Sequence, residues 1–184
     1  MNLPYSESHP EKKVGIGFTN RLTGSMYTSE VAFNRRLILV DIENIVGGGD
    51  SMASQVRAAQ SAIESVISPR PYDHVVLACG RFSVDTVGFE WEGARRLKVR
   101  SGVNGADLEL LDVLETEHVG ERFTEVVLVS GDGIFADSIS HLAPASGTDV
   151  TVVSRPEACS RRLRMAARNV LDLDFDPNAV LEAA

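Results

Sequence analysis

Three aspartates of this chain stand where acidic side chains can gather at one end of a sheet. Asp41 directly follows the apolar run 37–40, and Asp132 comes three residues after a second apolar run, 126–129. Asp107 lies in the first turn of a predicted helix. Carboxylates that meet repel one another unless a proton or a cation lies between them, so a cluster of three is most simply explained by Mg²⁺ or Mn²⁺.

Such a cluster could support hydrolysis. A hard cation keeps several of its waters, and one of these could attack a phosphodiester while the cation stabilises charge on the phosphate oxygens. Each aspartate taken alone has a simpler explanation, because Asp and Ser after a strand often cap the next helix. All three together favour a site over three separate caps.

The hydrophobic pattern indicates which elements must position these acids. Short apolar runs predict buried strands at 37–40, 75–78, 126–129, 150–153 and 170–173. Helical spacing predicts helices over about 52–66, 105–118, 135–142 and 156–167, and residues 81–104 suggest a short helix and then an edge strand around Arg96–Val99. Strands separated by helix-length segments imply right-handed βαβ units and a mostly parallel sheet, whose carboxyl edge gathers functional groups.

Length and composition limit the class of protein. With 184 residues, 43% of them hydrophobic, the chain can bury one sizeable core, so we expect a single α/β domain over residues 35–184. Residues 1–34 have no sustained period and are predicted to form a flexible arm or leader. No run approaches the roughly 20 apolar residues needed to span a bilayer, no signal pattern opens the chain, and its two cysteines lack metal-ligand spacing. These features predict a reduced protein of the cytoplasm that does not enter a membrane.

Three ordered segments carry a more specific signal. The chain reads LILVDIEN at 37–44, NGADLELL at 104–111 and VVLVSGDGIF at 126–135. These segments resemble the motifs of NYN domains, which are PIN-like ribonucleases of the branch called LabA-like. Residues 150–167 also resemble the last strand and helix of this fold, so that the likeness covers about residues 36–174. It implies a three-layer α/β/α domain with a mostly parallel central sheet, and a Mg²⁺- or Mn²⁺-dependent ribonuclease acting on single-stranded RNA.

The resemblance also implies roles for individual residues. It makes Asp41 the first metal ligand and places Asn44 beside the substrate or the metal-bound water. Asp107 matches the acid of the second motif, and Asp132 matches the first acid of the third. Ser130 is expected to support the turn before Asp132.

One position departs from the family's pattern. Many members read SGDxDF at the third motif, and this chain has Ile134 where the second acid would stand. An aliphatic side chain neither ligates a metal nor activates water. Asp137, about one helical turn later, is a candidate replacement, with an exposed helix acid as the alternative. Glu43 is a further supporting candidate, with a side chain that simply faces solvent as its alternative.

The charge of the chain is unevenly distributed. A net charge of −8 argues against a protein that coats nucleic acid through an overall positive potential. An acid-free stretch nevertheless precedes Asp107, and we expect it to contact RNA phosphates through Arg95, Arg96, Lys98 and Arg100. Phe89 and Trp91 could stack on unpaired bases, although a partly buried pair beneath an edge strand is the simpler explanation.

Two other functions fit parts of the same pattern. A haloacid-dehalogenase-like phosphatase would use Asp41 as nucleophile and Glu43 as general acid, but the NGAD helix has no place in that scheme. A non-catalytic RNA-binding or regulatory NYN domain would keep the acidic cleft and lack turnover because of Ile134. A domain of this kind can also form a homodimer.

Overall fold

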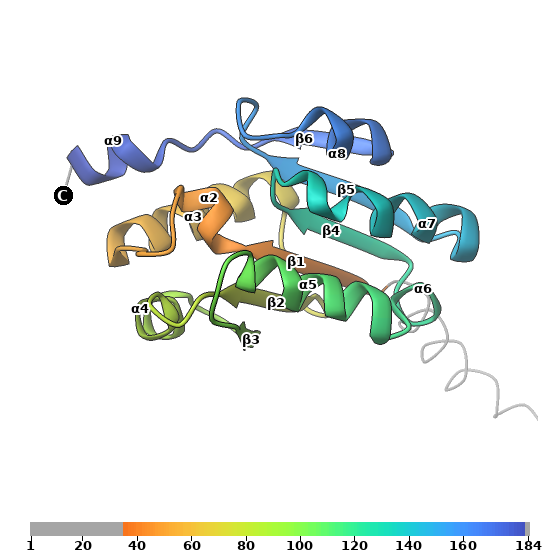
Figure 1. The fold of residues 1–184 in the computed structure, drawn as a ribbon, viewed down its shortest axis with the longest axis horizontal. Helices are drawn as coiled ribbons and strands as arrows, with labels where there is room; N and C mark the ends of the chain where they lie inside the picture. The colour runs from red at the N-terminus through yellow and green to blue at the C-terminus, as the bar shows by residue number, and fades with distance from the viewer. Residues whose placement is uncertain (1–34, 183–184) are drawn as a thin grey trace, which may run out of the picture.

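The computed structural model describes residues 35–182, and its centre is one sheet of six parallel strands in the order β3-β2-β1-β4-β5-β6 (Figure 1). The strands are β1 (Arg36–Asp41), β2 (His74–Cys79), β3 (Arg96–Val99), β4 (Glu125–Val129), β5 (Asp149–Ser154) and β6 (Asn169–Asp172). The predicted α/β fold with a parallel sheet is thereby confirmed. The arm or leader predicted for residues 1–34 lies outside the described residues.

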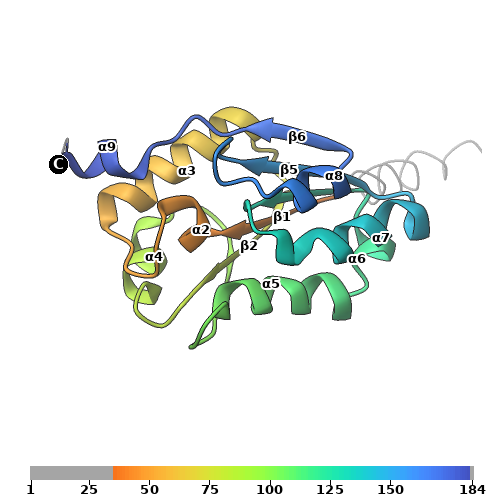
Figure 2. The same ribbon diagram turned by 45° about the horizontal axis from the view of Figure 1, so that its top comes forward.

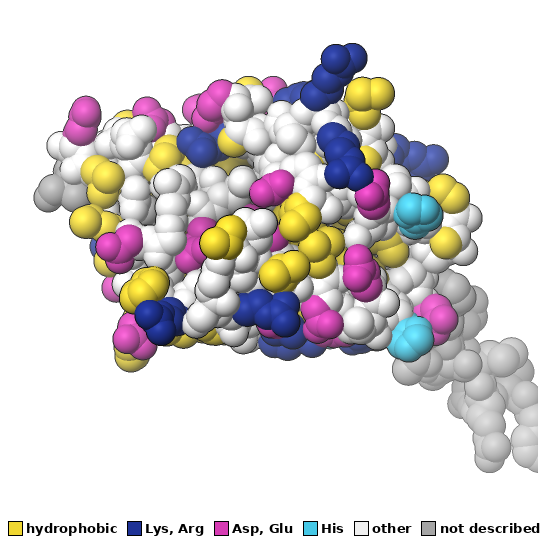
Figure 3. All heavy atoms as spheres, in the orientation of Figure 1, with side chains coloured by type: hydrophobic (Ala, Val, Ile, Leu, Met, Phe, Trp, Pro, Cys, Tyr) yellow, Lys and Arg dark blue, Asp and Glu magenta, His cyan; other side chains and the backbone are white. Residues whose placement is uncertain are grey.

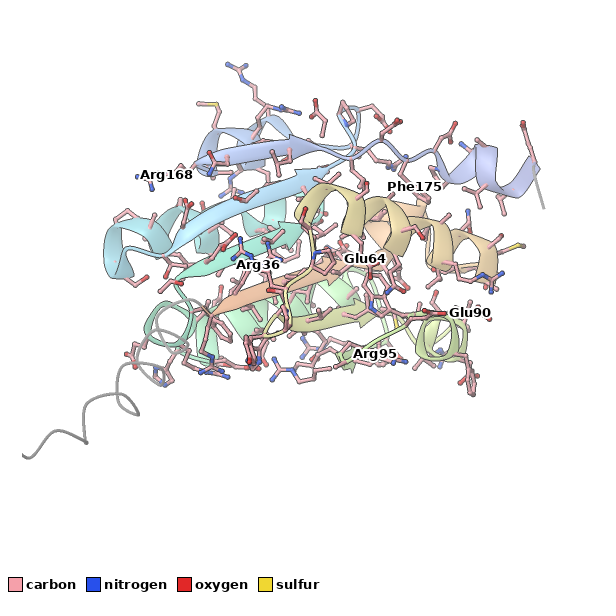
Figure 4. All side chains as sticks on the ribbon, turned by 180° about the vertical axis from the view of Figure 1, so that it is seen from behind. Arg36, Glu64, Glu90, Arg95, Arg168 and Phe175 are labelled. Carbon is pink, nitrogen blue, oxygen red and sulfur yellow. The ribbon has the colours of Figure 1, made fainter. Side chains whose placement is uncertain are left out.

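Helices cover both faces of the sheet and make it the middle of three layers. One face packs against α5 (Gly105–Thr116), α6 (Val119–Arg122), α7 (Ala136–Ser146) and α8 (Arg161–Ala166), which lie in front in Figure 1. The other face packs against α2 (Ile42–Val46), α3 (Ala53–Ile67) and α4 (Val84–Glu90), and Figure 4 shows it with α3 in front. The last helix, α9 (Pro177–Glu182), packs against α3. No helix within the described range 35–182 is long and apolar enough to cross a membrane.

The side chains of β1 alternate between the two cores. Leu37 and Leu39 pack on the face covered by α5, and Ile38 and Val40 pack on the face covered by α3. Successive side chains of a strand point to opposite faces, so Asp41 follows Leu37 and Leu39 toward α5. The alternation explains why a helix distant in sequence can meet the acid that ends β1.

The strand order reverses between β1 and β4. The chain leaves β1 for α3 on one face, and it leaves β4 through the 3-10 helix η1 (Gly133–Phe135) for α7 on the other face. A crevice opens where adjacent connections diverge in this way, and α/β proteins bind ligands there. Figure 2 shows β1 leading into α2 at this end of the sheet, where α5 also begins.

Several helix boundaries differ from the sequence-based prediction, and two of them have a clear local cause. The helix predicted from about residue 156 begins at Arg161, because the Ser160 hydroxyl accepts the N–H of Leu163 and caps the helix there. The helix predicted to reach residue 118 ends at Thr116, since His118 adopts a left-handed conformation with φ of 51°. The chain then starts α6. The periodicity of the sequence does not encode either boundary.

Candidate acidic active site

Asp41 is buried at the carboxyl end of β1, where two neighbouring segments hold its carboxylate. One oxygen, Oδ1, accepts the N–H of Asn44 at 3.2 Å, and Oδ2 accepts the hydroxyl of Ser130 at 3.1 Å. Ser130 is itself buried and directly follows β4. The acid is only 2% exposed, so the fold fixes its position and orientation.

Asp107 reaches the same place from the first turn of α5. Its side chain interacts directly with that of Asp41, and only 8% of the residue is exposed. Gly105 allows this approach, because a Cβ there would lie 2.2 Å from the main-chain oxygen of Arg100. The sequence predicted Asp107 in the first turn of a helix, and the structure places it there and also buries it.

The environment of this acidic pair favours a proton or a cation between the two carboxyl groups. Burial raises the pKa of Asp41 well above its ordinary value, and the carboxyl group of Asp107 raises it further. Burial also raises the pKa of Asp107; contact with Asp41 opposes this shift and the charge of Asp132 reinforces it. Two adjacent buried carboxylates without a shared proton or a counter-ion are unfavourable.

Asp132 lies near the pair but has a local role of its own. Its Oδ1 accepts the N–H of Ile134 at 2.9 Å, which caps η1, and its own N–H donates to the Ser130 hydroxyl at 3.2 Å. Asp132 therefore caps the following helix, which was the alternative explanation for this aspartate. Its charge still acts on Asp107, as the raised pKa of that residue indicates.

The donor set fits a hard divalent cation held by two carboxylates. Within residues 35–182, no three His, Cys, Asp or Glu side chains are grouped closely enough to hold one metal ion. Mg²⁺ commonly uses only one or two carboxylates and keeps waters for its remaining positions. Asp41 and Asp107 meet that requirement, with Asp132 as a neighbouring charge. A metal ligated by all three aspartates stays a prediction.

Asn44 positions the loop that follows β4. Its side-chain oxygen accepts the N–H of Gly131 at 2.8 Å, and the main-chain oxygen of Gly131 accepts the N–H of Ser160 at 2.8 Å. Glycine is needed at 131, since a Cβ there would lie 2.2 Å from the main-chain oxygen of Ala158. Asn44 thus fixes the segment that carries Ser130 and Asp132.

The two supporting acids of the sequence analysis have partners away from the pair. Glu43 accepts the N–H of Gly80 at 2.8 Å, so its carboxylate lies at the end of β2. Asp137 is 74% exposed and forms an ion pair with Arg162 at 2.5 Å. The exposed-acid alternative describes Asp137, and Glu43 contacts the backbone instead of facing solvent.

Ile134 has a packing role where the family's second acid would stand. Its side chain is partly buried against the core on the α5 face. Phe135, the next residue, is fully buried in the same core. The aliphatic residue therefore stabilises the turn that leads from β4 to α7.

Acidic side chains neutralise most of the cations that were predicted to bind RNA. Lys98 pairs with Glu109 at 2.7 Å, Arg100 lies 3.6 Å from the same carboxylate, and Arg96 pairs with Glu117 at 2.8 Å. Arg95 donates instead to main-chain oxygens. Figure 3 shows basic and acidic side chains side by side along the lower edge of the molecule, where Figure 1 places β3 and α5. Their role in RNA binding stays a prediction.

The two nearby aromatic residues have different environments. Trp91 is buried in the core on the α3 face, in agreement with the simpler explanation. Phe89 is 87% exposed and does not form a buried pair with it.

Arg155 is a site residue that the sequence analysis did not single out. It follows β5 directly, its side chain is 17% exposed, and its Nη2 donates to the main-chain oxygen of Asn44 at 3.4 Å. Its Nη1 pairs with Glu157 at 3.2 Å. A cation immediately after a strand, at the same edge of the sheet as Asp41, is the signal that could have identified it.

Known proteins share this sequence pattern and this arrangement of strands. The family model of the NYN domain matches residues 35–174. The "low amplitude and bright protein LabA" of Synechococcus elongatus is 38% identical over 69 residues, which are 38% of this chain and 37% of that protein. The aligned part therefore spans little more than a third of the length of that relative.

Solved structures add a likeness of fold. A protein of unknown function from Vibrio parahaemolyticus superposes with a TM-score of 0.53 and 20% identity, over 79% of this chain and 96% of that one. The MAR1 ribonuclease of Caenorhabditis elegans gives a TM-score of 0.38 at 14% identity, over 82% of this chain and 81% of that one. The family match covers most of the chain, and this chain belongs to the NYN domain family.

Proposed function

We propose that this chain is a metal-dependent ribonuclease that hydrolyses phosphodiester bonds of single-stranded RNA at the Asp41–Asp107 pair. The observation that carries the proposal is the burial of two adjacent carboxyl groups at the carboxyl edge of the sheet, where β1 and β4 pair. Such an arrangement destabilises a fold, so a chemical role is the simplest reason for it. Membership of the NYN family supports RNA as the substrate.

Asp41 and Asp107 would hold the Mg²⁺ or Mn²⁺ ion. When bound, the cation stabilises negative charge on phosphate oxygens and lowers the pKa of water. The Ser130 hydroxyl and the Asn44 N–H orient Asp41 through its two oxygens. Asp132 keeps its carboxylate beside Asp107 while it caps η1.

A non-catalytic RNA-binding domain is the second candidate. The packing of Ile134 against the core favours it, because no acid stands at that position to assist turnover. The phosphatase alternative needs the carboxylate of Glu43 as general acid beside Asp41, and this carboxylate is engaged by the Gly80 N–H instead. We therefore rank the phosphatase last.

Hydrolysis of end-labelled single-stranded RNA with Mg²⁺ or Mn²⁺ tests the proposal. Asp41→Asn should lower the rate at least about a hundredfold, as expected when a group that stabilises transition-state charge is lost. Asp137→Asn is the matched control, since its carboxylate is exposed and paired with Arg162. Activity that survives Asp41→Asn would refute this site.

The same assay separates the two candidates. An inactive wild type that binds RNA, together with an Ile134→Asp variant that cleaves it, would support the binding-domain function. Cleavage by the wild type that is lost in Asp41→Asn would support the ribonuclease.

A further inference from the structure

A second candidate site lies at the far end of α5. A cavity of about 370 Å³ opens there between the start of β2, the start of β3 and the end of α5. We call it the Phe123 cavity, and its lining includes His74, Arg96, Glu117, Arg122 and Phe123. Neither Asp41 nor Asp107 lines it.

The ring of Phe123 organises three basic side chains at this cavity. The guanidinium groups of Arg35 and Arg122 each lie 5.1 Å from the centroid of the Phe123 ring. The rings of His74 and Phe123 meet edge to face, with their centroids 5.3 Å apart. Arg35 also donates to Nε2 of His74 at 3.1 Å. Because arginine can only donate, Nε2 must accept and the imidazole is neutral in this arrangement.

Positive charge exceeds negative charge around the cavity. The single carboxylate of Glu117 forms ion pairs with two cations, Arg96 at 2.8 Å and Arg122 at 3.3 Å. Arg35 contacts the ring of Phe123 and the neutral imidazole of His74.

The other acid in the lining is already neutralised. Asp73 binds the buried guanidinium of Arg36 at 2.6 Å, on the face seen in Figure 4. Burial lowers the pKa of His74, and Arg35 and Arg122 lower it further, as a local excess of positive charge requires. The excess is local in a chain whose net charge is −8.

The Phe123 cavity is separate from the acidic pair. Asp107 lies in the first turn of α5, and Glu117 directly follows its last residue, Thr116. Ten residues of helix span about 15 Å. Figure 1 shows α5 running from the carboxyl edge of the sheet to α6. A small ligand in the cavity therefore does not contact Asp41.

We propose that the Phe123 cavity binds a phosphate group through Arg96 and Arg122, which line it, and through Arg35, which lies over the ring of Phe123. Guanidinium groups match phosphate oxygens with paired hydrogen bonds, and the contacts of Arg35 and Arg122 with the ring of Phe123 reduce the entropy lost on binding. An RNA strand or a free nucleotide carries this chemical group. The inference goes beyond ribonuclease activity and does not depend on it.

Titration of the full chain with inorganic phosphate at constant ionic strength tests the cavity, with amide chemical shifts as the readout. Saturable shifts are expected at Arg35, His74 and Phe123. Arg122→Gln should weaken binding about fivefold, as expected for one lost charge-assisted hydrogen bond. Arg57→Gln is the control, because Arg57 is an exposed cation that pairs with Glu90. Equal weakening by both variants, or no saturable shift near Phe123, overturns the proposal.

A second variant pair distinguishes binding from a structural role. Glu117→Gln removes the carboxylate that neutralises Arg96 and Arg122, so it should tighten phosphate binding about fivefold. Glu90→Gln, which removes the partner of Arg57, should leave the affinity for phosphate unchanged. A purely structural ion pair would give lower stability without tighter binding. Unchanged or weaker phosphate affinity in Glu117→Gln overturns the proposal.

RNA binding in an Asp41→Asn background identifies the source of the phosphate. If an RNA strand occupies the cavity, Arg122→Gln lowers the slope of log K against log salt by about 0.7. If Arg122→Gln weakens only inorganic phosphate, the cavity takes a free phosphate or nucleotide. Both results support the site. They are independent of cleavage, so failure of the ribonuclease assay would refute the proposed function and leave the cavity intact.

Discussion

Asp41, at the end of β1, and Asp107, in the first turn of α5, place their carboxyl groups against each other in a buried site. The alternation of side chains along β1 directs Asp41 toward the face covered by α5. Gly105 lets α5 begin close to the main chain of Arg100. Their contact raises the pKa of Asp41 and makes the pair unfavourable without a proton or a cation.

The metal-free protein should be less stable as pH rises, and Asp41→Asn should remove part of this dependence. A raised pKa means that the folded state holds the proton more tightly than the unfolded state. The stabilisation is complete below the ordinary carboxyl pKa, and it is lost as pH rises through the pKa of the folded state. At neutral pH without metal, Asp41→Asn should therefore melt about 3 °C or more above wild type, with a smaller difference at acidic pH. A variant that melts below wild type at neutral pH would contradict this account.

Millimolar Mn²⁺ or Mg²⁺ should raise the melting temperature of the wild type, since an ion that binds only the folded state stabilises it. Asp41→Asn and Asp107→Asn should each lose most of this increase, because Mg²⁺ needs its few carboxylate ligands. Asp137→Asn, whose carboxylate pairs with Arg162, should retain it. Equal stabilisation of all four proteins would place the ion elsewhere.

Gly131→Ala should destabilise the fold by about 1–3 kcal/mol. Its Cβ would lie 2.2 Å from the main-chain oxygen of Ala158, so the loop after β4 would have to move. Gly48→Ala is a suitable control, because nothing lies within 4 Å of a Cβ there. Denaturant unfolding of the two variants measures the difference. Similar midpoints for both would show that the loop has more room than the structure gives it.

Ser130→Ala should move the acidic limb of the ribonuclease pH–rate profile to higher pH. The Ser130 hydroxyl donates to the carboxylate of Asp41 and lowers its pKa, so removing the hydroxyl makes that carboxylate harder to ionise. The rate at a fixed acidic pH should fall about tenfold for each unit by which the limb moves. Ser140→Ala, which loses only a bond to the main-chain oxygen of Asp137, serves as the control. An unchanged limb would show that Asp41 does not govern the profile.

The sequence predicted the framework well because strand and helix periods are local. The runs 37–40, 126–129 and 150–153 lie inside β1, β4 and β5, and the edge strand predicted around Arg96–Val99 is β3. The family motifs also predicted the parallel sheet that the structure has.

By itself, the sequence determined the fold class, the family and the placement of Asp41 and Asp132 after strands, since each depends on residues close together in the chain. Only the tertiary structure decided which charges meet. The acid-free stretch before Asp107 is neutralised by Glu109 and Glu117 of a later segment, and Glu43 lies at the end of β2 instead of in the acidic pair. The partner of a side chain is set by strand order and by how helices cross the sheet, and no local period encodes these contacts.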